Sequence, residues 1–307
     1  MENTCIFKER GLFIKYNPMK IYSTNYMEEM ELEFFPCCYL VYIEPFDRIK
    51  LKDFLEMDNT ELSSYLNNIR KNQLDFSVMP QMLTCNPPCT CVGKELKYLN
   101  VSLDTSCNLH CRMCRAGVHI SKEETEIYYK VLDKCRGLHL DVLELTTVGE
   151  PFLYKERALE FLNSLTPDDT KQVNIITNGT LLTKEYIDKL EDMVKKTGVY
   201  IRVSVSIDSI DEVGYKLVRG GDFNKVVENT EYLNSKKMLT SVLCTISMPV
   251  LHQVPNVKKF WADKGIDVVL HLARPVKTNA RTQLTKSEFD FCKKSKVWQE
   301  AGITEID

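Results

Sequence analysis

From residue 97 onward, short apolar runs rich in Val and Ile alternate with longer segments whose apolar residues recur at helical spacing. The short runs predict strands at residues 98–103, 142–146, 173–176, 200–207, 241–247 and 267–271. The longer segments predict helices that begin near Ser121, Pro151, Thr183, Phe223 and Pro255. Such alternating units build a parallel sheet with right-handed crossovers, so the pattern predicts an α/β fold with an open, partial (β/α)6 barrel.

Residues at the expected helix ends support this interpretation. Ser121 and Glu124 form a capping-box pattern, in which Ser121 accepts a backbone hydrogen bond at the start of the helix. Thr183 is placed to cap the third helix, and Gly198 is placed to end it. These signals predict the boundaries of two helices independently of the apolar pattern.

Distinctive motifs follow the ends of the predicted strands. They are the loop 107–114, Val148-Gly149-Glu150-Pro151, Thr177-Asn178-Gly179, Ser204-Val205-Ser206-Ile207-Asp208 and Ser247-Met248-Pro249. Each of the later motifs is, taken alone, also typical of an ordinary turn or polar strand end. In parallel barrels, however, the carboxyl ends of the strands carry the chemistry, so we expect these motifs to meet on one face.

The first 94 residues have a different character. They contain Cys37 and Cys38, a predicted helix over 58–71 that opens with an Asp58–Glu61 capping box, and three more cysteines at 85, 89 and 91. We therefore expect three parts: a small cysteine-rich α+β module over 1–94, the barrel over 95–272, and a C-terminal tail over 273–307 that caps the open barrel.

Charge and hydropathy exclude several classes of protein. The chain of 307 residues has 40 Lys and Arg against 43 Asp and Glu, a net charge of −3, so no basic surplus indicates a nucleic-acid partner. Its longest apolar stretch, residues 34–43, is far shorter than the roughly 18 residues that span a bilayer. No export signal is recognisable at the N-terminus. We expect a cytoplasmic protein with no membrane partner.

In a reducing compartment, the 12 cysteines are expected to be ligands, nucleophiles or small core residues and not disulfides. Cys107, Cys111 and Cys114 have gaps of three and two residues, which lets one short loop present three thiolates to an iron–sulfur cluster and leaves one iron open. Zinc bound by these cysteines with His110 or His119 is the competing interpretation. Most of the isolated cysteines are expected in the core.

The cysteine loop after the first barrel strand, Gly149-Glu150-Pro151 after the second, and the six-unit pattern together resemble the radical S-adenosylmethionine (SAM) superfamily. The resemblance implies that Cys107, Cys111 and Cys114 hold a four-iron four-sulfur cluster whose open iron binds SAM. It implies further SAM contacts from Gly149, Glu150, Ser206 and Arg219. The protein would then cleave SAM reductively and abstract a substrate hydrogen, with electrons from a donor such as flavodoxin or ferredoxin.

The N-terminal cysteines resemble the SPASM module, an extension that binds an auxiliary iron–sulfur cluster and usually follows the barrel. The resemblance implies a second cluster on Cys38, Cys85, Cys89 and Cys91, with structural zinc or no metal as alternatives. Enzymes with this module often modify peptides or proteins by crosslinking, epimerisation or oxidation, so a peptide or protein is the expected substrate. A small metabolite and a non-catalytic metal-binding scaffold are the alternatives.

One isolated cysteine has a second interpretation. Cys244, in the fifth predicted barrel strand, would return a hydrogen atom to the substrate if its side chain pointed into the barrel. The alternative is a core cysteine that packs as a small hydrophobe. The direction of its side chain in the sheet decides between the two.

Overall fold

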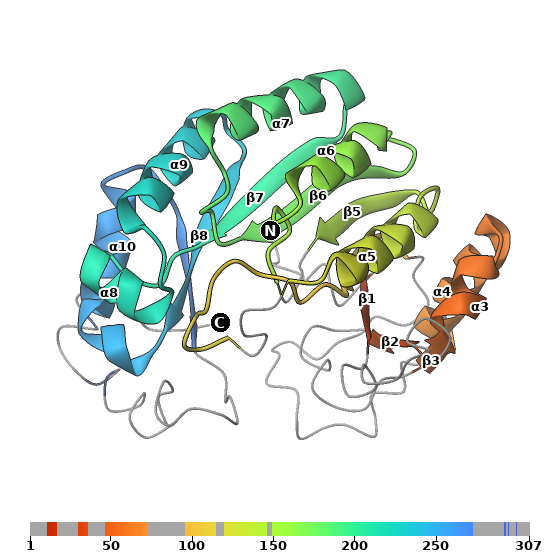
Figure 1. The fold of residues 1–307 in the computed structure, drawn as a ribbon, viewed down its shortest axis with the longest axis horizontal. Coiled ribbons are helices and arrows are strands. Elements are labelled where there is room, and N and C mark those ends of the chain that lie inside the picture. Colours follow the sequence, from red (N-terminus) through yellow and green to blue (C-terminus); the bar gives the residue numbers. More distant parts are fainter. Residues whose placement is uncertain are drawn as a thin grey trace.

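The computed structural model describes residues 11–16, 30–35, 47–72, 96–114, 120–145 and 149–272, together with residues 292, 294 and 299. Its strands form one sheet in the order β3-β2-β1-β4-β5-β6-β7-β8-β9 (Figure 1). The strands are β1 Gly11–Tyr16, β2 Glu31–Phe35, β3 Asp47–Lys50, β4 Tyr98–Ser102, β5 Leu140–Leu145, β6 Thr170–Thr177, β7 Tyr200–Ser206, β8 Leu239–Ile246 and β9 Val268–Leu272.

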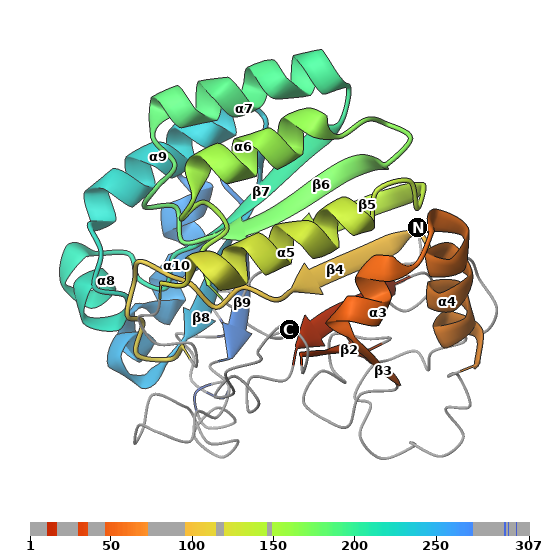
Figure 2. The ribbon, with the colours of Figure 1, turned by 45° about the vertical axis from the view of Figure 1, so that its right-hand side comes forward.

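Each barrel strand from β4 to β8 is followed by one or two helices. They are α5 Lys122–Lys134, α6 Lys155–Ser164, α7 Lys184–Thr197, α8 Glu212–Val218, α9 Phe223–Ser235 and α10 Val254–Ala262, with a 3-10 helix η4 at Met248–Gln253. The six strands β4 to β9 are all parallel, and each pairs with its neighbour in the chain. The helices cover one side of this curved sheet (Figure 2). The predicted α/β fold with a partial barrel is therefore confirmed.

Alternating side chains give the sheet two unlike faces. The outer face, under the helices, carries buried apolar side chains: Val173, Ile175, Ile201, Val203, Val205 and Val242. These belong to one core cluster with helix residues such as Ile187 and Leu190. Between them, the inner face of β6 and β7 carries Gln172, Asn174, Arg202 and Ser204, which are at least partly exposed. The main core thus lies outside the sheet, and the inner face of β6 and β7 carries mostly polar side chains.

The predicted helix ends are mostly correct. The Ser121 side chain accepts a hydrogen bond from Glu124 N, Thr183 caps α7 in the same way, and Gly198 ends α7 with a φ of +74°. The prediction at Pro151 is wrong by one turn, because residues 151–154 form turns and α6 starts at Lys155. Helix α8, capped by Asp211, has only seven residues and was not predicted.

The N-terminal strands continue the barrel sheet. Strand β1 pairs in parallel with β4 and antiparallel with β2, and β2 pairs with β3. Two further helices follow, α3 Leu51–Glu56 and α4 Asn59–Asn72. The predicted capping box of α4 is reciprocal: Asp58 accepts from Glu61 N at 2.8 Å, and Asp58 N donates to the Glu61 carboxylate at 2.9 Å. No helix in the described ranges is long and apolar enough to cross a bilayer.

The described segments of 1–94 thus share a sheet with the barrel, and the division into a separate module stays a prediction. Within the tail, only the three isolated residues are described.

Truncating a buried side chain of β2 tests how far this continuity extends. Leu32 is fully buried in the common core, so Leu32→Ala should lower the free energy of unfolding by about 2–5 kcal/mol. Because the sheet is continuous, the loss should appear in a single cooperative transition measured by chemical denaturation. Lys52→Ala, at an exposed position on α3, should stay within about 0.5 kcal/mol of the parent. Two separate transitions, with only one shifted by Leu32→Ala, would instead support an independent module.

Candidate active site

The cysteine loop lies between β4 and α5 and is held by the first turn of α5. Ser106 Oγ accepts a hydrogen bond from Ser121 N at 3.0 Å and donates one to Ser121 O at 3.2 Å. Glu124 accepts from the Thr105 hydroxyl at 2.7 Å, so its carboxylate reaches the loop. The predicted capping residues therefore also fix the start of the cysteine loop.

The three thiols of the loop interact electrostatically. Cys107 is buried, whereas Cys111 and Cys114 are partly exposed. The pKa of Cys111 is raised to about 11: burial is the largest cause, the positive charge of Arg219 opposes it, and negative charge at Asp208, Cys114 and Cys107 adds to it. Burial also raises the pKa of Cys107. Three thiolates packed this closely repel one another, so they favour a bound cationic centre that neutralises them.

Gly149 approaches the backbone of the cysteine loop so closely that no side chain fits. A Cβ atom built on Gly149 would lie 2.0 Å from Ser106 O. Gly149 N donates to Asp104 O at 3.1 Å, and Glu150 N donates to Ser106 O at 2.7 Å. These two backbone hydrogen bonds attach the Gly149–Glu150 segment to the chain just before Cys107. The two motifs predicted to meet are therefore in direct contact.

The Glu150 side chain joins this segment to the end of β6. Its carboxylate accepts hydrogen bonds from the Thr177 hydroxyl at 2.6 Å, Asn178 N at 2.8 Å and Phe152 N at 3.1 Å. Burial raises the pKa of Glu150, and these hydrogen bonds oppose the rise. Glu150 is only 1% exposed, so in this structure its carboxylate works as an internal link between two loops.

Asn178 continues the link back to the cysteines. Its Nδ2 donates to Asn108 Oδ1 at 3.0 Å and lies 3.9 Å from Cys107 Sγ. Cys107 Sγ also accepts from Leu109 N at 3.4 Å. Such N–H donors to sulfur are the contacts that tune iron–sulfur sites. Sequence reasoning named Asn178 only as part of a turn.

A buried ion pair closes the other side of the site. Arg219 Nε donates to Asp208 Oδ2 at 2.6 Å, and Asp208 Oδ1 accepts from Thr245 N at 2.7 Å. Arg219 Nη1 lies 4.0 Å from Cys111 Sγ. Burial by itself lowers the pKa of Arg219, but the charges of Asp208 and Cys111 raise it above its ordinary value. The structure thus gives Arg219 a carboxylate partner within the protein, and its predicted contact with SAM stays a prediction.

The remaining predicted residues differ in their placement. Ser206 is the last residue of β7 and lies partly exposed at the same edge of the sheet. Cys244 is 2% exposed and belongs to the core cluster together with Val242 and Ile246, the residues two positions before and after it on β8. The side chain therefore lies on the outer face of the sheet, which favours the core interpretation and gives the hydrogen-donor prediction no support.

The predicted auxiliary cluster residues, Cys38, Cys85, Cys89 and Cys91, lie outside the described residues. In the part of the chain that the structure describes, no group of three His, Cys, Asp or Glu side chains is spaced to hold a single metal ion. A zinc ion needs ligands that converge on one point, whereas the cysteines around a four-iron cluster bind different irons. The donor set of the loop, three cysteine thiols with nearby N–H donors, therefore fits the cluster better than zinc with His110.

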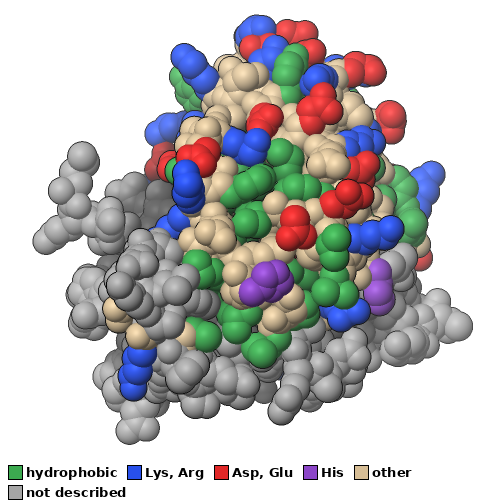
Figure 3. Space-filling model, turned by 90° about the vertical axis from the view of Figure 1, so that its left-hand side faces the viewer, with side chains coloured by type: hydrophobic (Ala, Val, Ile, Leu, Met, Phe, Trp, Pro, Cys, Tyr) green, Lys and Arg blue, Asp and Glu red, His purple; other side chains and the backbone are tan. Residues whose placement is uncertain are grey.

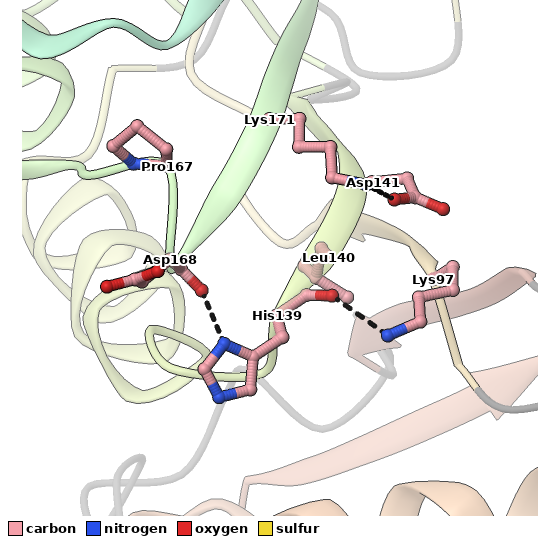
Figure 4. Close-up of a pocket in the computed structure, with 7 residues that line it drawn as sticks. All are labelled: Lys97, His139, Leu140, Asp141, Pro167, Asp168 and Lys171. Atoms are coloured by element: carbon pink, nitrogen blue, oxygen red, sulfur yellow. Dashed lines mark hydrogen bonds and ion pairs between the residues drawn. The ribbon is translucent and has the colours of Figure 1, made fainter.

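A separate cavity of about 420 Å³ lies at the opposite edge of the sheet (Figure 4). It is lined by Lys97, His139, Leu140, Asp141, Pro167, Asp168 and Lys171, at the starts of β4, β5 and β6. Its charged and polar groups are engaged with one another: Lys171 pairs with Asp141 at 2.7 Å, and His139 Nδ1 lies 2.8 Å from Asp168 O. This cavity is remote from the cysteine loop along the strands.

The fold and the cysteine loop agree with a comparison with known families. The family model described as "Radical SAM superfamily" matches residues 101–257, just over half of the chain. The chain therefore belongs to the radical SAM superfamily and is an enzyme. Membership implies a four-iron four-sulfur cluster and SAM as cofactors.

Several curated proteins are similar over the barrel. GTP 3',8-cyclase of Clostridium botulinum is 33% identical over 146 residues, which cover 45% of this chain and 44% of that protein. GTP 3',8-cyclase of Alkaliphilus oremlandii is 32% identical over 144 residues, 44% of this chain and 42% of that protein. The chain thus matches less than half the length of these relatives. An uncharacterized protein of Methanocaldococcus jannaschii is 28% identical over 206 residues, 62% of this chain and 64% of that protein.

Solved structures with a similar arrangement include SuiB of Streptococcus suis bound to S-adenosylmethionine. It has a TM-score of 0.49 and 14% identity and covers 85% of this chain and 63% of its own. Another is anSMEcpe with bound AdoMet, with a TM-score of 0.46 and 20% identity, covering 63% of this chain and 57% of its own.

Removing one partner of the buried ion pair should destabilise the fold strongly. Asp208→Asn leaves the Arg219 guanidinium buried without its countercharge, so the free energy of unfolding should fall by about 3–5 kcal/mol. Glu228→Gln breaks the exposed pair with Lys184 and should change it by at most about 1 kcal/mol. Denaturant titration of both cluster-free variants makes the comparison. Equal, small effects would show that Arg219 finds other partners or water.

Proposed function

We propose that Cys107, Cys111 and Cys114 hold the four-iron four-sulfur cluster and that this enzyme cleaves SAM reductively and abstracts a hydrogen atom from its substrate. The observation that carries the proposal is the placement of three cysteines in one loop that lies against Gly149, Asn178 and Arg219. When bound, the cluster supplies the electron that breaks the sulfonium bond. The residues of the protein position the cluster and SAM, balance the charge of the thiolates and shield the site from water.

The segment from Gly149 to Glu150 is proposed to receive the methionine end of SAM. Its backbone carbonyls are the proposed partners of the ammonium group, and its position is set by the contact with Ser106. The Glu150 carboxylate holds this segment against the end of β6, because it accepts hydrogen bonds from the Thr177 hydroxyl and Asn178 N. Ser206, at the end of β7, is proposed as a polar contact for the ribose or carboxylate, and Arg219 as a partner for the carboxylate.

Substituting the loop cysteines one at a time tests the cluster assignment. After anaerobic reconstitution, the parent protein should hold about four irons per chain, or about eight if the N-terminal cysteines hold a second cubane. Cys107→Ala, Cys111→Ala and Cys114→Ala should each lose one cluster and abolish 5'-deoxyadenosine formation from SAM under a strong reductant. Cys244→Ala should retain the iron and this activity, because Cys244 lies in the core.

Two results would contradict this assignment. One is full iron content and SAM cleavage in a loop-cysteine variant. The other is the absence of 5'-deoxyadenosine from reconstituted parent protein, which would favour the scaffold alternative.

The concave face of the sheet offers a place for the substrate. The register places four polar side chains side by side on neighbouring strands β4 to β7: Asn100, Glu144, Asn174 and Arg202. Asn100 Nδ2 donates to Glu144 Oε1 at 2.8 Å. We therefore propose a polar substrate on this face.

A small polar molecule with an anionic group is the substrate class that this face favours. Arg202 is exposed on this face, so its guanidinium can contact an anionic group of the substrate, whereas the Glu144 carboxylate is buried and accepts hydrogen bonds from Tyr98 and Asn100. The name of the curated relatives, GTP 3',8-cyclase, agrees with a small anionic substrate. The other candidate is a peptide or protein, which the resemblance of the N-terminal cysteines to a SPASM module favours.

The choice of substrate class can be tested on the reconstituted enzyme. Two panels should be compared: anionic metabolites that include GTP, and short peptides. For each compound, the measurements are how far it stimulates 5'-deoxyadenosine formation and whether its own mass changes in the reaction. We expect a member of the first panel to react. Arg202→Gln should then raise its KM by about 10-fold or more, because a charge-assisted hydrogen bond contributes about 1.5–3 kcal/mol.

Lys171→Gln provides the control for Arg202→Gln, because Lys171 is a basic residue of the neighbouring strand β6 that lies outside the row and pairs with Asp141. Its KM should equal that of the parent. A reaction with peptides alone would overturn the small-molecule proposal. Its product would either be lighter by two hydrogens, or have an unchanged mass in normal water and take up deuterium when the reaction is run in deuterium oxide.

An electron donor such as flavodoxin or ferredoxin is a further proposed partner, and the cytoplasm the proposed location. Helix α8 lies beside the cysteine loop, since Arg112 N donates to Val218 O at 2.9 Å. Val213 and Leu217, one turn apart on α8, are 80% and 40% exposed. Apolar side chains gather on this side of the molecule (Figure 3). An exposed apolar surface next to the cluster loop supports docking of a donor there.

A further inference from the structure

Tyr215 places an aromatic ring between α8 and the cysteine loop. Its side chain is fully buried and packs against Phe223, with ring centroids 5.8 Å apart. A Cβ atom built on Gly221 would lie 3.1 Å from Tyr215 Cε1 and 3.6 Å from Leu109 Cδ2. The hydroxyl-bearing half of the ring therefore borders the same small space as a residue of the cysteine loop.

The Tyr215 hydroxyl has no hydrogen-bond partner among the described residues, although it is buried. Buried hydroxyls are rarely left unpaired, so such a group calls for an explanation. Burial raises the pKa of Tyr215, Arg219 lowers it, and negative charge at Cys111, then at Asp208 and Glu150, raises it further. The geometry agrees, because Arg219 N donates to Tyr215 O at 2.7 Å and Arg219 Nη1 lies 4.0 Å from Cys111 Sγ, so Tyr215 belongs to the helical turn beside the cysteine loop.

The acceptors around this hydroxyl are already engaged, with one exception. Asp208 accepts from Arg219 Nε and Thr245 N, and Glu150 accepts from three donors at the end of β6 and in its own turn. Among the described residues, Cys111 Sγ has one hydrogen-bond contact, from Arg219 Nη1 at 4.0 Å. A thiolate accepts hydrogen bonds better than a thiol, so the acceptor strengthens when Cys111 becomes a ligand.

We propose that the Tyr215 hydroxyl donates a hydrogen bond to the Cys111 sulfur of the loaded cluster and thereby raises the cluster's reduction potential. The inference rests on the proposed function, because it requires the cluster to be bound by Cys111. A hydrogen bond to a cluster sulfur stabilises the more negative, reduced state. Tyr215 is then a positioning residue that makes the cluster easier to reduce.

Potentiometric titration of the cluster, followed by electron paramagnetic resonance, tests the proposal. Tyr215→Phe removes only the hydroxyl, and the potential should move to a more negative value. Tyr128→Phe is the matched control, because Tyr128 is also a buried tyrosine with an unpartnered hydroxyl. The charged groups that act on Tyr128 are Tyr129 and Asp104, with no cysteine among them, so its potential should equal that of the parent.

A second measurement needs no variant. In parent protein exchanged into deuterium oxide, electron–nuclear double resonance should detect an exchangeable proton coupled to the reduced cluster, and Tyr215→Phe should lack that signal. Normal iron content with an unchanged potential in Tyr215→Phe, or equal shifts in both tyrosine variants, would overturn the proposal. A change in SAM affinity alone would also overturn it and assign the hydroxyl to SAM. Failure of the parent protein to assemble a cluster would instead refute the proposed function.

Discussion

The contact between Gly149 and Ser106 is the constraint on which the rest of the site depends. A Cβ atom on Gly149 would lie only 2.0 Å from the carbonyl oxygen of Ser106, the residue just before Cys107. Two loops that follow neighbouring strands can meet this closely only if one of them has no side chain. The Gly149–Glu150 segment and the cysteine loop are therefore one rigid surface, and a ligand held by one is placed relative to the other.

Charge balance adds a second constraint. The three proposed cysteine ligands must become thiolates in a partly buried loop, and among the described residues Arg219 supplies a positive charge that acts on Cys111. A buried guanidinium needs its own partner, which Asp208 supplies from the end of β7. The position of Arg219 is therefore fixed before any cluster or SAM binds. This preorganisation explains why an arginine predicted to contact a ligand carboxylate already has a carboxylate in the protein.

Local chemistry made much of the fold and part of the site predictable. Ser121 and Thr183 signal helix starts through their own side chains, and the Cys107 loop signals a cluster through spacing that does not depend on the rest of the fold. Asn178 and Tyr215 could not be found this way. Their importance comes from distant partners: Asn178 contacts Asn108, and Tyr215 lies on a seven-residue helix too short to give an apolar period.

Cys244 shows where periodicity alone cannot decide. The register between β7 and β8 shifts between Val203 and Ser204, so that Leu239 pairs with Val203 but Ser241 pairs with Ser204. Because side chains alternate with a period of two, a shift of one residue moves all later β8 side chains to the opposite face. Without the bulge, Cys244 would face the barrel interior. The extra residue turns it into the core, and no pattern within β8 itself reveals that residue.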